Sequence, residues 1–331
     1  MKAGKEHSSR ELAQHNTQRA KLSRRVAGCP NVALQYAVVE EAMYGALVRA
    51  ATQVPPDIRI ALEQALATET SDLSREHLRA ALENMRLAES GHGLVCADTG
   101  FPLFYVAAGD QVQIEGGLQS LWRAAESAVH RATDKGFLRP TMVDPISRAN
   151  PGDNVGGGMP HVDLAIRSGD ELEIVAVPKG GGSEIFGTFY HMFFPSDGQE
   201  GIYDFVMDCI VAGCYAGKIC PPAIVGVGIG GTADLCMLTA KRQAVLRPVG
   251  RVNEDPRLAE MESALLEASH HLGVGPMGAA GRNAVLAVHI GTMFTHTAGL
   301  PVAVNAQCMV GRRWIARVQL SGEVEYTGDI R

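Results

Sequence analysis

Residues 223–231 read AIVGVGIGG, an apolar run that ends in a glycine-rich turn. Residues 226–231 match the pattern G-x-G-x-x-G, which joins a strand to a helix in dinucleotide-binding folds. Those folds also need a second strand that ends in an acidic residue about 20 residues further on. The helix-like segment 232–246 is instead followed by RPVGRVNEDP, which contains no such strand. The stretch therefore predicts a closely packed strand–helix corner and makes a dinucleotide-dependent oxidoreductase the most distant alternative.

The rest of the chain divides into a helical part and a mixed part. Helical apolar spacing marks residues 32–53, 57–68 and 73–89, the last with an N-terminal turn at Ser74 and Glu76. Beyond residue 90, short apolar strands are expected at 103–109, 161–166, 171–178, 223–229 and 301–308, and helices at 117–134, 200–216, 232–246 and 256–272. The sequence predicts a mixed α/β (α+β) fold with a helical region (31–90), an α/β body (91–331) and a basic extension (1–30).

Charge and hydropathy exclude several classes of protein. The net charge is −6, but residues 1–30 carry +5 and the remaining 301 residues carry −11. An acidic body argues against nucleic-acid binding. No apolar run approaches the roughly 20 residues that a membrane-spanning helix needs. The extension is acid-poor, as transit peptides are, but it has no apolar secretory segment, and a solvated tail on a cytoplasmic protein is the simpler interpretation.

A second glycine run, PKGGGSE at 178–184, follows the predicted strand 171–178. Successive backbone amides in such a run can bind an anion, although a tight turn is an equally good interpretation. The nearby Lys179 and Ser183 favour the anion. The run is not a phosphate-binding Walker loop, because its lysine precedes the glycines.

Six of the seven cysteines fall into two groups. Cys96, Cys220 and Cys308 lie where predicted helices or strands end, where a thiolate can reach a metal without distorting regular structure. Cys209, Cys214 and Cys236 lie inside apolar helical stretches and are expected to be buried, and Cys29 lies in the basic extension. Separations of 124 and 88 residues exclude a local zinc knuckle. From spacing alone, a dispersed three-thiol site and three ordinary reduced cysteines both remain open.

Five ordered blocks carry a resemblance to a known family. These are CADTG (96–100), LRP…DP…NPGDN (138–154), PKGGGSE (178–184), CPP…VGVGIGG (220–231) and HTAGLPVAVNAQC (296–308). Their order resembles that of class I fumarases and L(+)-tartrate dehydratases, over roughly residues 30–325. The chain looks like the α subunit of these oxygen-sensitive iron–sulfur hydro-lyases, and the resemblance implies the fold of the N-terminal domain of class I fumarases.

The resemblance implies a cofactor and a set of site residues. Three cysteines of the family hold a [4Fe–4S] cluster with one open iron, and they match Cys96, Cys220 and Cys308. Residues near the substrate match Asp98 and His296, expected to be catalytic, and Arg139 and Gly182, expected to bind substrate. An open iron can polarise a departing hydroxyl as a Lewis acid, and an arginine can bind a carboxylate through two hydrogen bonds. Ala97 departs from the family's usual glutamine, and GSEI from its usual GSEN.

The resemblance also implies partners and a reaction. Because the catalytic base of the family lies in a C-terminal domain, we expect a separate β subunit with a swivelling-type domain, in an α2β2 heteromer. Hydration of fumarate to (S)-malate is the first expected reaction, and dehydration of L(+)-tartrate to oxaloacetate is the alternative. A non-catalytic iron–sulfur sensor or interaction subunit is a more distant alternative to an enzyme subunit.

Overall fold

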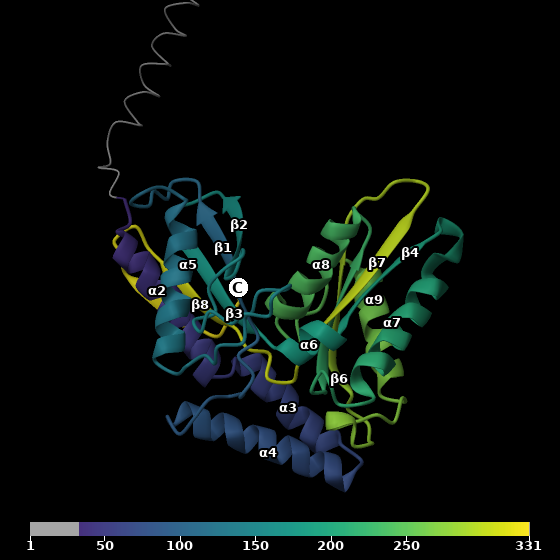
Figure 1. Cartoon of the computed structure of the whole chain (residues 1–331). Helices are drawn as coiled ribbons and strands as arrows, with labels where there is room; N and C mark the ends of the chain where they lie inside the picture. The colour runs from purple at the N-terminus through teal and green to yellow at the C-terminus, as the bar shows by residue number, and fades with distance from the viewer. Residues whose placement is uncertain (1–32, 331) are drawn as a thin grey trace, which may run out of the picture. The chain divides into compact units, whose positions relative to one another are not determined.

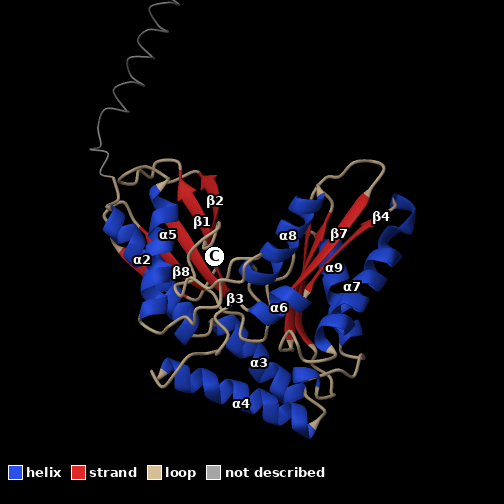
Figure 2. Cartoon of the chain, in the orientation of Figure 1, coloured by secondary structure: helices blue, strands red, loops and turns tan. Residues whose placement is uncertain are grey.

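The structure, a computed structural model, describes residues 33–330 (Figures 1 and 2). The predicted basic extension and Cys29 lie outside the described residues, so predictions about them stay predictions. The mixed α/β class is confirmed, with helices first and sheets after them. The helices are α2 (Tyr36–Thr52), α3 (Pro56–Thr68), α4 (Asp72–Glu89), α5 (Ser120–Asp134), α6 (Gly181–Phe186), α7 (Gly198–Cys214), α8 (Ala233–Leu246) and α9 (Pro256–Ser269).

The strands of residues 33–330 form two separate sheets. The five-stranded sheet has the order β2-β1-β3-β8-β9, and the four-stranded sheet has the order β4-β7-β5-β6. In the second sheet β5 pairs parallel with β6 and antiparallel with β7. The strands are β1 (Phe101–Gly109), β2 (His161–Arg167), β3 (Leu172–Lys179), β4 (Thr188–Phe193), β5 (Ala223–Ile229), β6 (Val285–Thr292), β7 (Leu300–Gln307), β8 (Trp314–Val318) and β9 (Val324–Thr327).

The sequence predicted β1, β2, β3, β5 and β7 but missed the other four strands. Two of these carry a buried polar residue, His289 in β6 and Arg317 in β8, which interrupts the apolar pattern. The start of α4 was also misplaced. The helix begins at Asp72 with Ser71 as its N-cap, because the Ser71 hydroxyl accepts the backbone N–H of Ser74. Ser74 therefore lies inside the first turn of the helix.

Helix α8 lies between the two sheets (Figure 1). Cys236 and Ala240 pack on Ala303 of β7, and Ala244 and Val245 pack against β1 and β3 of the other sheet. The approach of α8 to β5 depends on two strand glycines. A Cβ at Gly226 would stand 2.0 Å from the Ala240 carbonyl oxygen, and one at Gly228 would stand 2.1 Å from that of Cys236. The close strand–helix corner predicted for 223–231 is therefore present.

Helices α3 and α4 support the ends of both sheets (Figures 1 and 2). Ile58 and Leu62 of α3 and Met85 of α4 form a core cluster with Cys308 and Met309, which directly follow β7. The carboxyl end of β7 is thereby fixed on a helical base. Among residues 33–330, no helix is long and apolar enough to cross a lipid bilayer.

Candidate metal centre and active site

The loop that carries Cys96 and Asp98 is pressed against the end of β3. Gly100 has φ +70°, and a Cβ on it would stand 1.8 Å from the Lys179 carbonyl oxygen. Only glycine combines this backbone conformation with so close an approach. The Asp98 backbone N–H lies 3.4 Å from the Cys96 sulfur, so the thiol and the carboxylate share one turn. This fixes both relative to the glycine run after β3.

The glycine run binds an anion, and that anion is the chain's own Asp98. One Asp98 carboxylate oxygen accepts the Gly181 N–H at 2.6 Å, and the other accepts the Gly100 N–H at 3.0 Å. The run forms the first turn of the short helix α6, with Gly180 as its N-cap. Both interpretations of PKGGGSE therefore hold in part: it is a tight turn, and one of its amides, that of Gly181, helps to orient a carboxylate.

Lys179 does not face the glycine amides. Its side chain is fully buried, and its ammonium donates to the Ser183 hydroxyl at 2.9 Å and to the Ala306 carbonyl at 2.6 Å. Glu184 lies 3.6 Å away. Burial lowers the pKa of Lys179 to about 8, against the opposing effect of Glu184. The role we inferred for Lys179 as an anion ligand is wrong, because the ammonium instead ties the glycine run to β7.

Cys220 and Cys308 lie beside the Cys96 loop. The Cys220 carbonyl accepts the Met309 N–H at 3.1 Å, which joins the loop after α7 to the residues after β7. Burial of the sulfur raises the pKa of Cys220 to about 11, although the residue as a whole is exposed, and the charges of Cys308 and Cys96 act in the same direction. Burial also raises the pKa of Cys308, with Arg312 opposing the shift. The three thiols are therefore close enough to act on one another electrostatically.

The other described cysteines differ in both place and surroundings. Cys209 and Cys214 are buried in α7, and Cys236 is buried in α8, as expected for small apolar side chains. Burial raises the pKa of the Cys214 thiol to about 12. These three cysteines belong to helix packing.

Of the remaining predicted site residues, two lie near the cysteine loops and one does not. The Arg139 backbone N–H donates to the Thr99 hydroxyl at 2.5 Å, and its side chain is exposed. A Cβ on Gly182 would stand 2.5 Å from the Lys218 carbonyl oxygen. His296 lies in the exposed loop between β6 and β7, at the opposite end of β7 from Cys308. With a rise of about 3.3 Å per residue, β7 separates them by roughly 25 Å.

Arg312 is the residue at this centre that sequence reasoning missed. It is 2% exposed, and it donates through Nη1 to the Asp98 carbonyl oxygen. Its Nε and Nη2 have no hydrogen-bond partner among residues 33–330. The sequence offered a signal, the pair of adjacent arginines four and five residues after Cys308, in a segment that is otherwise apolar.

The donor set suits a metal cluster better than a single metal ion. Within the described part of the chain, no three His, Cys, Asp or Glu side chains are arranged to hold a single metal ion. Three neighbouring thiols beside an unpartnered buried guanidinium fit a larger anionic group, such as an iron–sulfur cluster bound by thiolates. The residues present are thus compatible with the expected cofactor.

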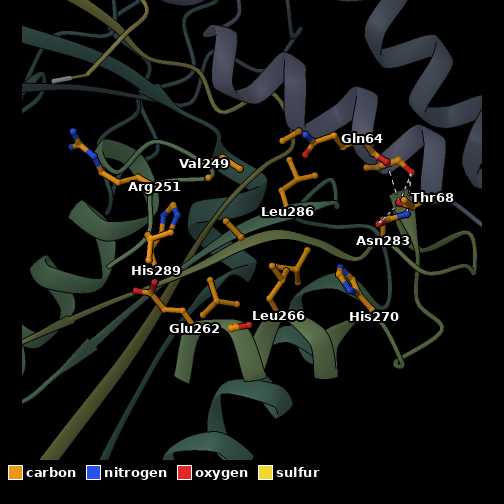
Figure 3. A pocket seen from close by; sticks show the side chains of 18 of the residues that line it. Gln64, Thr68, Val249, Arg251, Glu262, Leu266, His270, Asn283, Leu286 and His289 are labelled. Atoms are coloured by element: carbon orange, nitrogen blue, oxygen red, sulfur yellow. Dashed lines mark hydrogen bonds between the residues drawn. The ribbon is translucent and has the colours of Figure 1, made fainter. Parts of the chain in front are cut away.

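A separate cavity of about 610 Å³ lies between α3, α9, β6 and residues 249–252 (Figure 3). Leu266 and Leu286 are among the apolar side chains that line it. The Glu262 carboxylate is bound to Arg247 at 2.5 Å and to the Ile290 N–H at 2.7 Å. Burial lowers the pKa of His289 to about 4, so this imidazole is neutral. None of the predicted site residues lines this cavity, and its buried polar groups are engaged with the protein itself.

Comparisons with known proteins agree with this arrangement. A sequence model of the fumarate hydratase (Fumerase) family matches residues 40–317. A Methanocaldococcus jannaschii protein provisionally named L(+)-tartrate dehydratase subunit alpha is 38% identical over 277 residues, which cover 83% of this chain and 95% of that protein. The L(+)-tartrate dehydratase subunit alpha of Escherichia coli UTI89 is 35% identical over 268 residues, which cover 81% and 86%.

These matches define the class of protein. The expected enzyme class, a hydro-lyase of the fumarate hydratase or tartrate dehydratase type, is confirmed. The chain belongs to the fumarate hydratase (Fumerase) family.

Proposed function

We propose that the chain is the cluster-binding α subunit of an iron–sulfur hydro-lyase that dehydrates a C4 2-hydroxydicarboxylate. The convergence of the Cys96, Cys220 and Cys308 thiols beside the Asp98 carboxylate carries this proposal. Those three thiols would hold a [4Fe–4S] cluster. When bound, a cluster held by three protein ligands supplies a Lewis-acidic iron for the hydroxyl group that leaves.

The chain's own residues would bind and orient the substrate. The Asp98 carboxylate is held by two backbone amides, which leaves lone pairs to orient a hydroxyl or receive its proton. The exposed guanidinium of Arg139 can bind one substrate carboxylate through two hydrogen bonds. The missing Cβ of Gly182 lets the Lys218 carbonyl oxygen pack against the glycine run, and the Gly182 main chain would bind the other carboxylate.

A β subunit would complete the site. The relatives are named as alpha subunits, which supports a heteromer, and an α2β2 assembly is our proposal. We propose that this partner brings the base that removes the carbon-bound proton. His296 stays a proposed catalytic residue, but within one chain it does not reach the thiols. The free described cysteines favour a reducing, cytoplasmic location.

L(+)-tartrate is the first substrate to test, and the fumarate/malate pair is the second. The names of the relatives favour tartrate, whereas the family model is described by fumarate. Lys179 does not favour fumarate over tartrate, because its buried ammonium is bound to Ser183 and Ala306. Turnover of malate, L(+)-tartrate and mesaconate by the complete αβ enzyme would separate these substrates.

The first experiment is anaerobic reconstitution of the full chain with iron and sulfide, followed by EPR spectroscopy. We expect a cluster that gives a three-iron signal on mild oxidation. Cys96→Ser, Cys220→Ser and Cys308→Ser should each lose most of the iron. Cys236→Ser, which replaces a buried thiol in α8, should bind iron as the wild type does. Wild-type protein without a cluster, or equal iron in all four variants, would contradict the proposal.

A further inference from the structure

The side chain of Arg312 is unusual among the buried cations of its segment. Arg313 donates to both oxygens of the Asp57 carboxylate at 2.7 Å. Arg317 donates to Glu173 at 2.9 Å. Arg312 is as buried as these two, yet within residues 33–330 it donates only to a backbone carbonyl oxygen, that of Asp98. A buried guanidinium without an anionic partner costs several kcal/mol, so the described protein lacks the group that would offset this cost.

The free nitrogens of Arg312 lie among the residues of the candidate centre. A Cβ on Gly180 would stand 3.5 Å from Nη2 and 3.7 Å from the Asp98 carboxylate. Arg312 follows Cys308 by four residues, and the Asp98 carbonyl oxygen that accepts its Nη1 N–H belongs to the turn that carries Cys96. The missing anion is therefore expected where the three thiols meet.

The burial of Arg312 decides between two possible anions. A substrate carboxylate must enter from solvent, and the exposed Arg139 is the arginine placed to receive it. Arg312 is only 2% exposed, and its Nη2 lies beside Gly180 of the glycine run. A group built into the protein, rather than one that arrives at each turnover, fits this position.

We propose that Arg312 is a cluster-binding residue whose Nε and Nη2 donate to the sulfur atoms of the cluster and its thiolates. This inference rests on the proposed function. A cluster held by three thiolates carries net negative charge, and a buried cation with N–H donors offsets that charge. Hydrogen bonds to the sulfurs and the net charge around a cluster set its reduction potential. Arg312 thus raises the potential and slows oxidative loss of the cluster.

The test compares Arg312→Met and Arg312→Lys with wild-type full-length chain, each reconstituted anaerobically. Without the cation, Arg312→Met should show a lower midpoint potential in an EPR-monitored titration. In air it should lose iron about tenfold faster than wild type. Arg312→Lys keeps the charge but not the planar pair of donors, so it should fall between the two. Arg313→Lys is the matched control, and it should lower thermal stability while leaving the midpoint potential unchanged.

A stability measurement separates cluster binding from a purely structural role. In the apo protein, Arg312→Met removes a buried cation without an anionic partner, so its melting temperature should equal or exceed that of wild type. In the cluster-loaded protein the same variant should melt lower than wild type. A structural arginine would instead lower both melting temperatures, and that result would overturn the proposal.

Three further outcomes are decisive. If Arg312→Met keeps the wild-type potential and air stability but raises KM for the substrate, Arg312 binds substrate and the proposal is wrong. If wild-type chain binds no cluster, the proposed function itself fails. A loaded wild type with an unaffected Arg312→Met overturns this inference alone.

Discussion

The two ends of strand β7 are built in opposite ways. At its carboxyl end, Cys308 and the residues after it are buried on α3 and α4, and the loops of Asp98 and Cys220 hydrogen-bond to them. At its amino end, the loop 293–298 is exposed, with Phe294 fully in solvent. The imidazole of His296 accepts only the Ala298 N–H there, at 3.1 Å.

This difference teaches where the chain fixes geometry by itself. The buried end combines glycine backbone that excludes a Cβ with charged groups held by hydrogen bonds. Its side chains therefore have few alternative conformations. The exposed end has one such glycine, Gly230, where a Cβ would stand 2.0 Å from the Met293 carbonyl oxygen. The loop beyond it, residues 294–298, contains no Asp, Glu, Lys or Arg and is exposed, so its conformation is determined by fewer contacts. Functional groups at the buried end are preorganised by one chain, and those at the other end depend on what binds there.

Gly100→Ala is expected to have the largest effect on the buried end of β7. Its Cβ would stand 1.8 Å from the Lys179 carbonyl oxygen at φ +70°, so the cysteine loop must move away from β3. We expect the free energy of unfolding to fall by more than about 4 kcal/mol, or the chain not to fold. Chemical denaturation followed by circular dichroism measures this.

Two controls separate the steric clash from the backbone conformation. Gly91→Ala has φ +83° but open space around the new Cβ, so it should cost only about 1 kcal/mol. Gly299→Ala, at the exposed end of β7, meets only the flexible Met192 side chain and should change stability by less than about 1 kcal/mol. Equal costs at Gly100 and Gly91 would show that the close approach is not needed.

Lys179→Met tests the buried cation that ties the glycine run to β7. The pKa of Lys179 falls from 10.5 to about 8 in the folded chain, so the unfolded chain binds more protons between these values. The stability of wild type relative to Lys179→Met should therefore rise as pH increases from about 8 to 10.5, by up to roughly 3 kcal/mol. Urea unfolding of both proteins across this range gives the difference, and a flat difference would contradict a depressed pKa.

The smallest effect is expected at the exposed end. His296→Ala removes an exposed ring with one local contact, so the free energy of unfolding should change by less than about 0.5 kcal/mol. Iron content after reconstitution should also equal that of wild type. Turnover by the complete αβ enzyme should nevertheless fall if His296 is catalytic. A loss of iron in the isolated chain would mean that this loop reaches the thiols after all.

The sequence by itself determined the local features of this protein. Apolar periodicity located α3, α8 and β5 to within a few residues, because the secondary structure of a strongly periodic segment follows from its own sequence. The glycines at 226 and 228 predicted a close strand–helix corner, and that corner is present. The order of the five sequence blocks predicted the family.

Only the tertiary structure decided which of the predicted residues meet. Cys96, Cys220 and Cys308 are far apart along the chain, and no local rule places them together. His296 is much nearer to Cys308 in sequence, yet an extended strand keeps the two apart. Burial likewise decided the roles of two cations, since a sequence does not show that Lys179 turns inward or that Arg312 lacks a carboxylate. The physical reason is that burial and long-range contacts depend on how whole elements pack, whereas periodicity depends only on neighbours along the chain.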